Sequence, residues 1–546
     1  MLFIPWHSNW KPQYMKFIFS ILTLVLSLMS FAQNEYHVFP IDSKSIKGSP
    51  NGDGSLNRPW DLQTALSQTS ERINGGDIIW LHTGIYNGNY KSTLNSTIDS
   101  KYITVAAYKN DVVVLNGNIK DRTHYVLEVS GNRIKFKNFE VTYIGDFIRT
   151  KTDKPFKTVT GVNHIDGEDC KFQNLTIHNI PGSGFGSWKA TGGSVIEDCI
   201  IYNNGYKAKR GHGVGIYVQN ESDKIRILRN NIVFNNYYKG IEVWSASSGT
   251  DRQFVKNVNL EDNIVFNNGV PSGRPWSNLI VASGDRKGIN VAKSISVKSN
   301  VFYHNVDFKD PKNYGHGNSM TIGYTDKALV EDIHIEDNVI IGRNNALNIL
   351  HAKSLEFKNN TIYTGYIHFE KSTLTGLEKG KLQFNNNRYH TRKVKGLRII
   401  KHKDLQLAEW KSKCNIDGQS QWKSLQRFEV DPVLKISSLD AGSQKFNVAL
   451  LEKEGHDVEV DFSAQGVKKG QIYKIYDIEN RQTVIKAGML TGDLKVTFPM
   501  GGSEFERPLH NAEATKSAAN FGVYRIEFES PKKTVGFFKR FFGWLF

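Results

Sequence analysis

Two short phrases of the sequence, Asn231-Ile-Val-Phe and Asn263-Ile-Val-Phe, are copies of one repeat in the middle of the chain. Further copies, each an asparagine or cysteine followed by a short strand-like stretch and then a turn, begin at Asn138, Asn174, Cys199, Asn300, Asn338, Asn360 and Asn386. The steps between successive copies are 36, 25, 32, 32, 37, 38, 22 and 26 residues. Self-similarity on this scale is typical of a solenoid, and apolar alternation with period 2 predicts that the repeats consist of strands. The 22-residue step fits one turn of a parallel β-helix.

The asparagines are expected to form a column along this solenoid. Strands of successive coils lie about 4.8 Å apart, so an asparagine at an inward bend reaches its counterparts above and below. Its amide then satisfies backbone groups that would otherwise be buried without a partner. We therefore predict a buried ladder of these eight asparagines and Cys199, whose small thiol fits one rung.

A second set of motifs precedes the repeat. It comprises Gly54-Ser55, Pro59-Trp60-Asp-Leu-Gln-Thr-Ala65, Gly76-Asp77-Ile-Ile-Trp-Leu, Gly84-Ile-Tyr86, Ile103-Thr-Val and Leu115-Asn-Gly117. Together with the repeat, these motifs resemble the pectin-lyase-like right-handed β-helix superfamily, including secreted bacterial, chondroitinase-B-like polysaccharide lyases. The resemblance covers about residues 36–430. It implies an all-β, right-handed parallel β-helix, a fold that hosts lyases, hydrolases, epimerases and non-enzymes.

The chain begins with an expected export signal. Lys16 precedes an apolar run from Phe17 to Met29, and small residues at Ser30 and Ala32 fit a cleavage site. Residues 1–32 are therefore predicted to be a signal peptide, with Met15 as the true start. We expect the mature protein to be secreted, periplasmic or on the outer cell surface.

Three segments follow this signal. Residues 33–430 are predicted to form the β-helix domain, with a short amphipathic cap helix from Trp60 to Thr69. Residues 440–530 alternate like strands and predict a small β-sandwich. The tail, 531–546, is basic and aromatic. Weak membrane contact is one alternative for this tail, and a docked helix or a disordered end are the others.

The net charge of the chain indicates which class of partner it binds. The chain carries a formal charge of +16, and removal of the two lysines of residues 1–32 leaves +14. Such a surface suits an anionic partner, and we expect an acidic polysaccharide rather than nucleic acid, because no nucleic-acid-binding motif is present.

The three cysteines, Cys170, Cys199 and Cys414, are not expected to form a disulfide framework, and Cys170 and Cys199 are expected to lie inside the fold. We expect a monomer.

One strand of each coil is expected to line a groove. The strands align as Gly215-Ile-Tyr-Val-Gln219, Gly240-Ile-Glu-Val-Trp244, Asn278-Leu-Ile-Val-Ala282, Ser319-Met-Thr-Ile-Gly323, Ala346-Leu-Asn-Ile-Leu350 and Tyr366-Ile-His-Phe-Glu370. Their central residues predict an outward column of Tyr217, Glu242, Ile280, Thr321, Asn348 and His368. Coils between Cys199 and Asn338 are longer than the minimum, and their surplus predicts loops that wall the groove.

The groove supplies residues suited to breaking an acidic polysaccharide. The candidate catalytic residues are Arg210, His212, Tyr217 and Glu242. The candidate substrate-binding residues are Trp188, Gln219, Trp244, Arg252, Arg274, Trp276, Arg286, Lys287 and His316. No metal ligands and no cofactor are identified from motifs, and calcium is left open because some lyases of this superfamily use it.

Four functions fit these residues. β-Elimination of a uronate polymer needs a cation for the carboxylate, a base for the C5 proton and an acid for the leaving oxygen, and a polysaccharide lyase is our first expectation. The Lys/Arg pair that such lyases often carry is not found. A glycoside hydrolase would pair Glu242 with Asp251 or Asp285. A uronate C5-epimerase would use nearly the same residues as a lyase, and a non-catalytic polysaccharide-binding protein is the remaining alternative.

Overall fold

The computed structural model describes residues 33–117, 124–145, 158–207, 212–246, 251–310, 317–439 and 444–530. The predicted signal peptide, its start at Met15 and the basic aromatic tail lie outside these residues. Within the described residues, no helix is long and apolar enough to cross a membrane.

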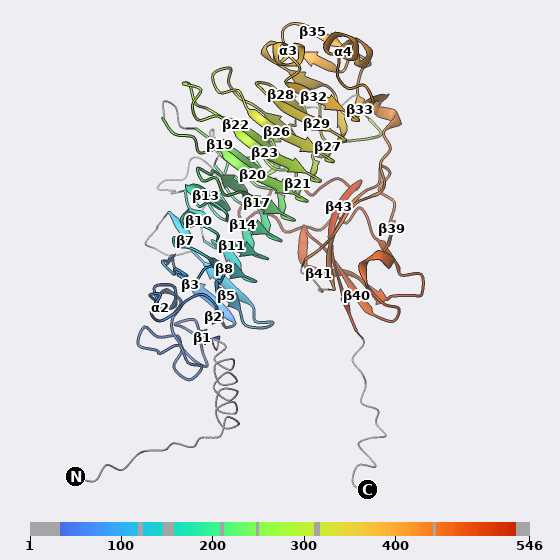
Figure 1. Cartoon of the computed structure of the whole chain (residues 1–546). Coiled ribbons are helices and arrows are strands. Elements are labelled where there is room, and N and C mark those ends of the chain that lie inside the picture. Colours follow the sequence, from blue (N-terminus) through green and yellow to red (C-terminus); the bar gives the residue numbers. More distant parts are fainter. Residues whose placement is uncertain are drawn as a thin grey trace, which may run out of the picture.

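Three long sheets run the length of a parallel β-helix (Figure 1). Sheet 1 contains β1 (Glu35–Val38), β2 (Ile78–Leu81), β5 (Ile103–Ala107), β8 (Ile134–Lys137), β11 (Lys171–Gln173), β14 (Val195–Glu197), β17 (Arg226–Arg229), β20 (Lys256–Glu261), β23 (Lys293–Lys298), β26 (Glu331–Glu336), β29 (Leu355–Lys358) and β32 (Leu382–Asn385). Sheet 2 contains β3 (Gly84–Asn87), β6 (Val113–Asn116), β9 (Glu140–Thr142), β12 (Thr176–His178), β15 (Ile200–Tyr202), β18 (Ile232–Phe234), β21 (Ile264–Phe266), β24 (Val301–Tyr303), β27 (Val339–Ile341), β30 (Thr361–Thr364), β33 (Arg388–Thr391) and β36 (Gln421–Ser424). Sheet 3 contains β4 (Tyr90–Ser92), β7 (Tyr125–Val129), β10 (Thr160–Asp166), β13 (Phe185–Ala190), β16 (Ile216–Val218), β19 (Ile241–Ser245), β22 (Leu279–Ser283), β25 (Met320–Ile322), β28 (Leu347–Ile349), β31 (Ile367–Phe369), β34 (Leu397–Ile399) and β35 (Lys403–Leu405).

The chain passes from sheet 1 to sheet 2 to sheet 3 in each coil, and the strands pair in parallel except for β34 with β35. One continuous apolar core fills the coils from Val38 to Cys414. Cys170 and Cys199 are buried free thiols within it, as predicted. The predicted parallel β-helix is thus confirmed.

The asparagine ladder lies at the bend between sheets 1 and 2. It begins at Cys199 and continues through Asn231, Asn263, Asn300, Asn338, Asn360 and Asn387, all buried. Each asparagine Oδ1 accepts hydrogen bonds of 2.9–3.2 Å from the backbone and side-chain amides of the asparagine one coil before it. Every coil therefore fixes the height of the next one.

The predicted register of this ladder was wrong at Asn138, Asn174 and Asn386. These three residues occupy the preceding turn position, where φ is 65°, 50° and 53°. The inward positions of their coils belong to Phe139, Leu175 and Asn387. Asparagine tolerates left-handed backbone as well as it forms ladders, so the residue type alone does not distinguish the two adjacent positions.

Helices close both ends of the solenoid. At the N-terminal end, α2 (Leu62–Leu66) buries Leu62, Ala65 and Leu66, and the Asp61 side chain caps it by accepting from the Thr64 amide. This short helix lies within the predicted cap. At the other end lie α3 (Lys371–Glu378) and α4 (Leu407–Cys414). Trp410 of α4 is fully buried, so the last coil leaves no open apolar edge.

The C-terminal residues form an antiparallel β unit, as expected. Its larger sheet has the order β37 (Val433–Ser438), β38 (Lys445–Leu451), β43 (Phe521–Glu529), β40 (Ile472–Asp477) and β41 (Asn480–Met489). Strands β39 (Val458–Asp461) and β42 (Lys495–Phe498) form a second, two-stranded sheet, and a separate apolar core fills this unit. Short 3₁₀ helices lie at η1 (Val270–Ser272), η2 (Leu425–Arg427) and η3 (Ser463–Gln465).

The C-terminal unit lies alongside the β-helix and covers sheet 2 (Figure 1). Outward rings of Tyr202, Phe234 and Phe266 stack at 4.9 and 4.8 Å between centroids. Phe521 of β43 stacks on Tyr303 at 3.9 Å. Strands such as Ile-Val-Phe are apolar on both faces because the inner face meets the core and the outer face meets this unit.

Replacing Asn300 by alanine tests the ladder. The change leaves the backbone and side-chain amides of Asn263 without their acceptor in a buried site. We expect the free energy of unfolding to fall by about 3 kcal/mol, measured by chemical denaturation. Asn386→Gly is the matched control, because this exposed residue lies one position outside the ladder in left-handed backbone that glycine adopts freely. Equal losses for both variants would contradict the observed register.

Candidate functional site

The outward face of sheet 3 forms the floor of the candidate site. Strand pairing aligns Tyr217 with Glu242, Glu242 with Ile280, and Ile280 with Thr321, then continues through Asn348 and His368. The predicted column of six residues is therefore confirmed. In the other direction it continues through Gly186, Asn163, Glu128 and Lys91.

Two sets of loops border this floor. The described residues of wall 1 belong to the loops that lead from sheet 2 into sheet 3 and are 203–207, 212–215, 235–240, 267–278, 304–310 and 317–319. The described residues of wall 2 belong to the loops that lead from sheet 3 into sheet 1 and are 219–225, 246, 251–255 and 284–292. His212, Arg274 and Trp276 lie on wall 1, whereas Arg252, Arg286 and Lys287 lie on wall 2. Arg210 and His316 lie outside the described residues.

A buried ion pair joins wall 1 to the floor. The Nζ of Lys239 lies 2.5 Å from Oε1 of Glu242, and these residues are only 8% and 6% exposed. Burial lowers the pKa of Lys239, but attraction to the Glu242 carboxylate and interaction with Tyr238 outweigh burial and raise the pKa above its ordinary value. Lys239 thus carries a fixed positive charge at the groove surface.

Tyr217 lies next to this pair. Burial and the negative charge of Glu242 raise the pKa of its phenol, although a hydrogen bond from the Gln219 amide at 2.8 Å opposes the shift. The phenol therefore stays protonated at neutral pH. Trp188, which is 40% exposed, lies 5.2 Å from Tyr217 between ring centroids, and its indole donates to Asn163. These contacts bring together the predicted residues Trp188, Tyr217, Gln219 and Glu242.

Further aromatic residues continue along the groove. Trp244 meets the exposed ring of Tyr324 at 5.0 Å, and the ammonium group of Lys239 lies 5.7 Å from the Trp244 ring. On wall 1, Trp276 packs against Tyr238 at 4.6 Å and carries the Arg274 guanidinium 4.1 Å above its ring. Aromatic faces beside cationic groups are suited to stacking on sugar rings and attracting carboxylates.

His212 lies on wall 1 near the central cluster. Its ring stacks on Tyr206 at 5.4 Å, and the following residue, Gly213, accepts a hydrogen bond from the Tyr238 amide. The loop that carries His212 therefore lies against the turn that carries Lys239.

The predicted cations of wall 2 differ in their surroundings. Arg252 is held by an ion pair with Glu221 at 2.7 Å. Arg286 and Lys287 are exposed.

The prediction that Asp285 could serve as the second carboxylate beside Glu242 was wrong. Asp285 is fully buried and accepts hydrogen bonds from the amides of Ile289 and Asn290, so it stabilises its own loop. Asp251 is exposed on wall 2. Within the described part of the column, Glu242 has Tyr217 and Ile280 as its neighbours and no second carboxylate beside it.

Glu242 is not suited to act as a calcium ligand. The carboxylate of Glu242 is engaged by the Lys239 ammonium group, which would repel a cation. Among the described residues, no group of three or more His, Cys, Asp or Glu side chains is arranged to hold a metal ion.

Sequence reasoning missed two residues that build this site. Lys239 directly precedes the groove strand and lies three residues from Glu242, a spacing that could have identified it. Arg226 is fully buried inside the coil, and it donates from sheet 1 to the hydroxyls of Ser187 and Thr191 on either side of Trp188. Burial lowers the pKa of Arg226 to about 9. In the sequence, Arg226 resembles any charged residue of a strand. Only the coil geometry shows that it supports the strand that carries Trp188.

Comparison with known proteins places this geometry in a family. A family model described as the Pel9A-like, right-handed β-helix region matches residues 44–328, just over half of the chain. The chain belongs to this Pel9A-like β-helix family. The predicted right-handed β-helix is thereby confirmed.

A comparison with solved structures found several that are similar to this Pel9A-like protein at low sequence identity. One is described as pectate lyase Pel9A, with 16% identity over 76% of this chain and 86% of the other, and a TM-score of 0.43. A rhamnogalacturonan lyase has 15% identity, coverage of 65% and 87%, and a TM-score of 0.45. A complex of XylC with xylose has 11% identity, coverage of 90% and 100%, and a TM-score of 0.43. A search of curated proteins gave no match.

A buried histidine holds wall 1 of the Pel9A-like groove in place. Nε2 of His304 lies 2.7 Å from the carbonyl oxygen of Trp276 and 3.0 Å from that of Asn318, so it donates to both strand-entry turns. Burial lowers the pKa of His304 from 6.5 to about 4. The folded protein therefore keeps this imidazole neutral at pH values where the unfolded chain would protonate it.

This difference predicts acid destabilisation of the wall. Because the folded pKa is below the unfolded value, the stabilisation is complete above pH 6.5 and is lost as the pH falls from 6.5 towards 4. Protonation of His304 in the unfolded chain should by itself lower the free energy of unfolding by about 2 kcal/mol as the pH falls from 7 to 5. Denaturation curves at both pH values should show a smaller loss between pH 7 and pH 5 for His304→Gln, whereas surface His402→Gln should keep the wild-type loss. An unchanged loss in His304→Gln would contradict this assignment.

Proposed function

We propose that this chain is an exported polysaccharide lyase that cleaves an acidic polysaccharide by β-elimination in the groove over sheet 3. The observation that carries the proposal is the cluster of Lys239, Glu242, Tyr217 and Gln219 at the centre of the groove floor. Membership of a family whose namesake structure is described as a pectate lyase supports it.

The cluster supplies two of the three groups that elimination needs. Lys239 remains charged, and an ammonium group has three donors, so it can bind a substrate carboxylate while it keeps Glu242. This attraction stabilises the negative charge that develops on the carboxylate when the C5 proton leaves. Tyr217 is the proton donor, because its phenol stays protonated beside Glu242.

We assign the base to His212. A neutral imidazole has a pKa near the operating pH, and the His212 loop lies against the Lys239 turn. The imidazole takes the C5 proton, the electrons of that bond form the C4–C5 double bond, and the C4–O bond breaks. Tyr217 then donates its proton to the leaving oxygen, so the reaction yields an unsaturated uronate and a new chain end.

A glycoside hydrolase is the second candidate, and the geometry favours it less. Hydrolysis requires two carboxyl groups roughly 5 to 9.5 Å apart. Glu242 has no second carboxylate beside it in the described column, and Asp285 is buried within its own loop. The net charge of +14 expected for the mature chain and the exposed Arg274, Arg286 and Lys287 suit an anionic polymer.

The test is absorbance near 235 nm during incubation with pectate, alginate, glucuronan and chondroitin, because the C4–C5 double bond of the product absorbs there. We expect a rise with at least one of these uronate polymers. Tyr217→Phe and Lys239→Met should each lower kcat/KM by 100-fold or more, which corresponds to about 3 kcal/mol of transition-state stabilisation. His212→Ala should lower kcat by a similar factor with little effect on KM.

The matched control is Lys91→Met. Lys91 stands in the same column and also faces a glutamate, with Nζ 3.3 Å from Oε1 of Glu128, but it lies five coils away from Glu242. The Lys91→Met variant should change kcat/KM less than about threefold. New reducing ends without absorbance would favour hydrolysis, and binding of a polymer without any product would favour the non-catalytic alternative.

A further inference from the structure

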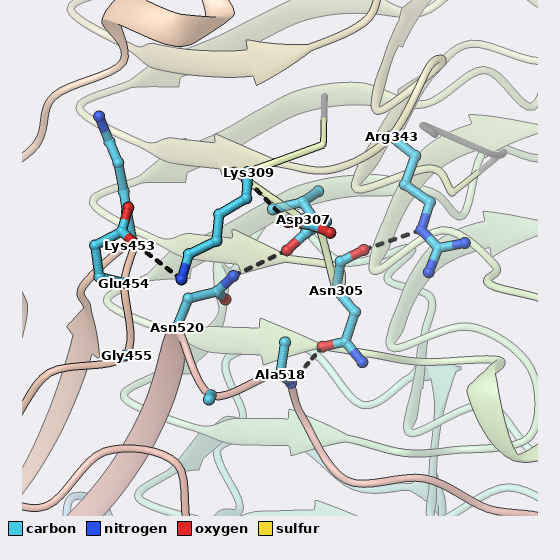
Figure 2. A pocket seen from close by; sticks show the side chains of 11 residues that line it. Asn305, Asp307, Lys309, Arg343, Lys453, Glu454, Gly455, Ala518 and Asn520 are labelled. Atoms are coloured by element: carbon cyan, nitrogen blue, oxygen red, sulfur yellow. Dashed lines mark hydrogen bonds and ion pairs between the residues drawn. The ribbon is translucent and has the colours of Figure 1, made fainter. Parts of the chain in front are cut away.

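A cavity of about 510 Å³ lies between the β-helix and the C-terminal unit (Figure 2). This volume is within the range of small-molecule sites, about 300 to 1,000 Å³. The β-helix contributes Asn305, Lys309 and Arg343, and the C-terminal unit contributes Lys453, Ala518 and Asn520. Asn305 and Lys309 belong to the beginning of the last loop of wall 1, next to sheet 2, and none of these six residues belongs to the floor or the central cluster of the groove.

Hydrogen bonds across the junction fix the shape of this cavity. Oδ1 of Asn305 accepts from the Ala518 amide at 3.0 Å. The side chain of Asn520 accepts from the Tyr303 hydroxyl at 2.7 Å and donates to the Val306 carbonyl at 2.9 Å. Asn520 is buried and Tyr303 is fully buried, so the walls are held by satisfied polar groups rather than by loose surface contacts.

The charges around the cavity are not balanced. Figure 2 shows Lys309 reaching across to Glu454, and this ion pair measures 2.8 Å. Arg343 donates through Nε to the Asn305 carbonyl at 2.9 Å, which leaves its two terminal nitrogens for other partners. Arg343 has no ion-pair partner among the described residues. The ammonium group of Lys453 lies 5.8 Å from the Phe428 ring, and Figure 2 shows this side chain leading away from Arg343. Asp307 also lines the cavity, but its carboxylate caps a turn by accepting from the amides of Lys309 and Asp310.

These groups define the chemistry of a ligand. Arg343 can bind a carboxylate through its two terminal nitrogens. The small side chains of Ala518 and Ala519 and the backbone of Gly455 leave room for a sugar ring beside this guanidinium group. The side-chain amides and backbone groups nearby suit hydroxyl groups.

We propose that this cavity is a second saccharide site, which binds a uronic acid through Arg343. The choice of a uronate as the ligand rests on the proposed function, whereas the cavity and the available terminal nitrogens of Arg343 do not. A site of this kind binds the end of an acidic chain or a released sugar at the junction of the two units, away from the central cluster where the chain is cleaved.

The experiment is isothermal titration of the full chain with galacturonate and glucuronate, with galactose as the neutral probe. All three probes are monosaccharides with no glycosidic bond to cleave, so turnover does not interfere. We expect one of the uronates to bind at least tenfold more tightly than galactose. Arg343→Met should weaken this binding at least tenfold. Lys435→Met is the control, because Lys435 joins the same two units through Asp262 at 2.6 Å but lies away from the cavity.

The Lys239→Met variant separates this proposal from the proposed function. Binding of the uronate should persist in Lys239→Met, although turnover of polymer should be lost. If no polymer is cleaved but the uronate binds and Arg343→Met abolishes binding, the lyase assignment fails and the cavity proposal stands. Absence of uronate binding, equal binding of galactose, or full retention of binding in Arg343→Met would each overturn the cavity proposal. Circular dichroism of every variant checks that the fold is retained.

Discussion

The structure depends on the need to stack coils at a constant height. Parallel strands hydrogen-bond to the coil on either side, but the bends between sheets leave backbone groups pointing inward. The ladder from Cys199 to Asn387 satisfies these groups and ends at Asp417, which accepts from Asn387 and Tyr389. A shorter ladder of Asn204, Asn236, Asn268 and Asn278 performs the same task at the bend between sheets 2 and 3, with side-chain contacts of 2.9 Å. Because each rung fixes the next, side chains at equal positions form straight columns, and the groove is one of these columns.

The three sheets have different outer faces, and this difference organises the molecule. Sheet 1 carries alternating charges that pair along the coils, as in Lys298 with Glu336 and Lys353 with Glu331, so it faces water. Sheet 2 carries stacked aromatic rings and is covered by the C-terminal unit. Sheet 3 carries polar and aromatic residues between two walls. Because sheet 1 faces water and sheet 2 packs against the C-terminal unit, sheet 3 is the face on which a long ligand can bind.

The centre of the groove is built from groups that are costly to bury alone. Glu242 and Lys239 compensate each other at the surface of the floor, and Arg226 inside the coil is compensated by two hydroxyl groups rather than by a carboxylate. Removing one partner of a buried ion pair costs more than the pair contributes to stability. Such an arrangement fits a site in which charge must be held in place, because the same charges would be cheaper to place in solvent.

The sequence by itself determined the fold and the column of the groove. The spacing from Asn231 to Asn360 identified the coils, and the pattern around Gly215 and Gly240 aligned Tyr217 with Glu242, because strand periodicity and coil length leave only one register that keeps the apolar residues inside. The sequence did not distinguish Asn386 from Asn387, since adjacent asparagines suit either turn position. Only the tertiary structure revealed the Lys239–Glu242 pair, the Arg226 contacts and the cavity at Arg343 and Lys453. Those features depend on side-chain directions and on the docking of residues as distant as Tyr303 and Asn520, and no local pattern of the chain encodes such distances.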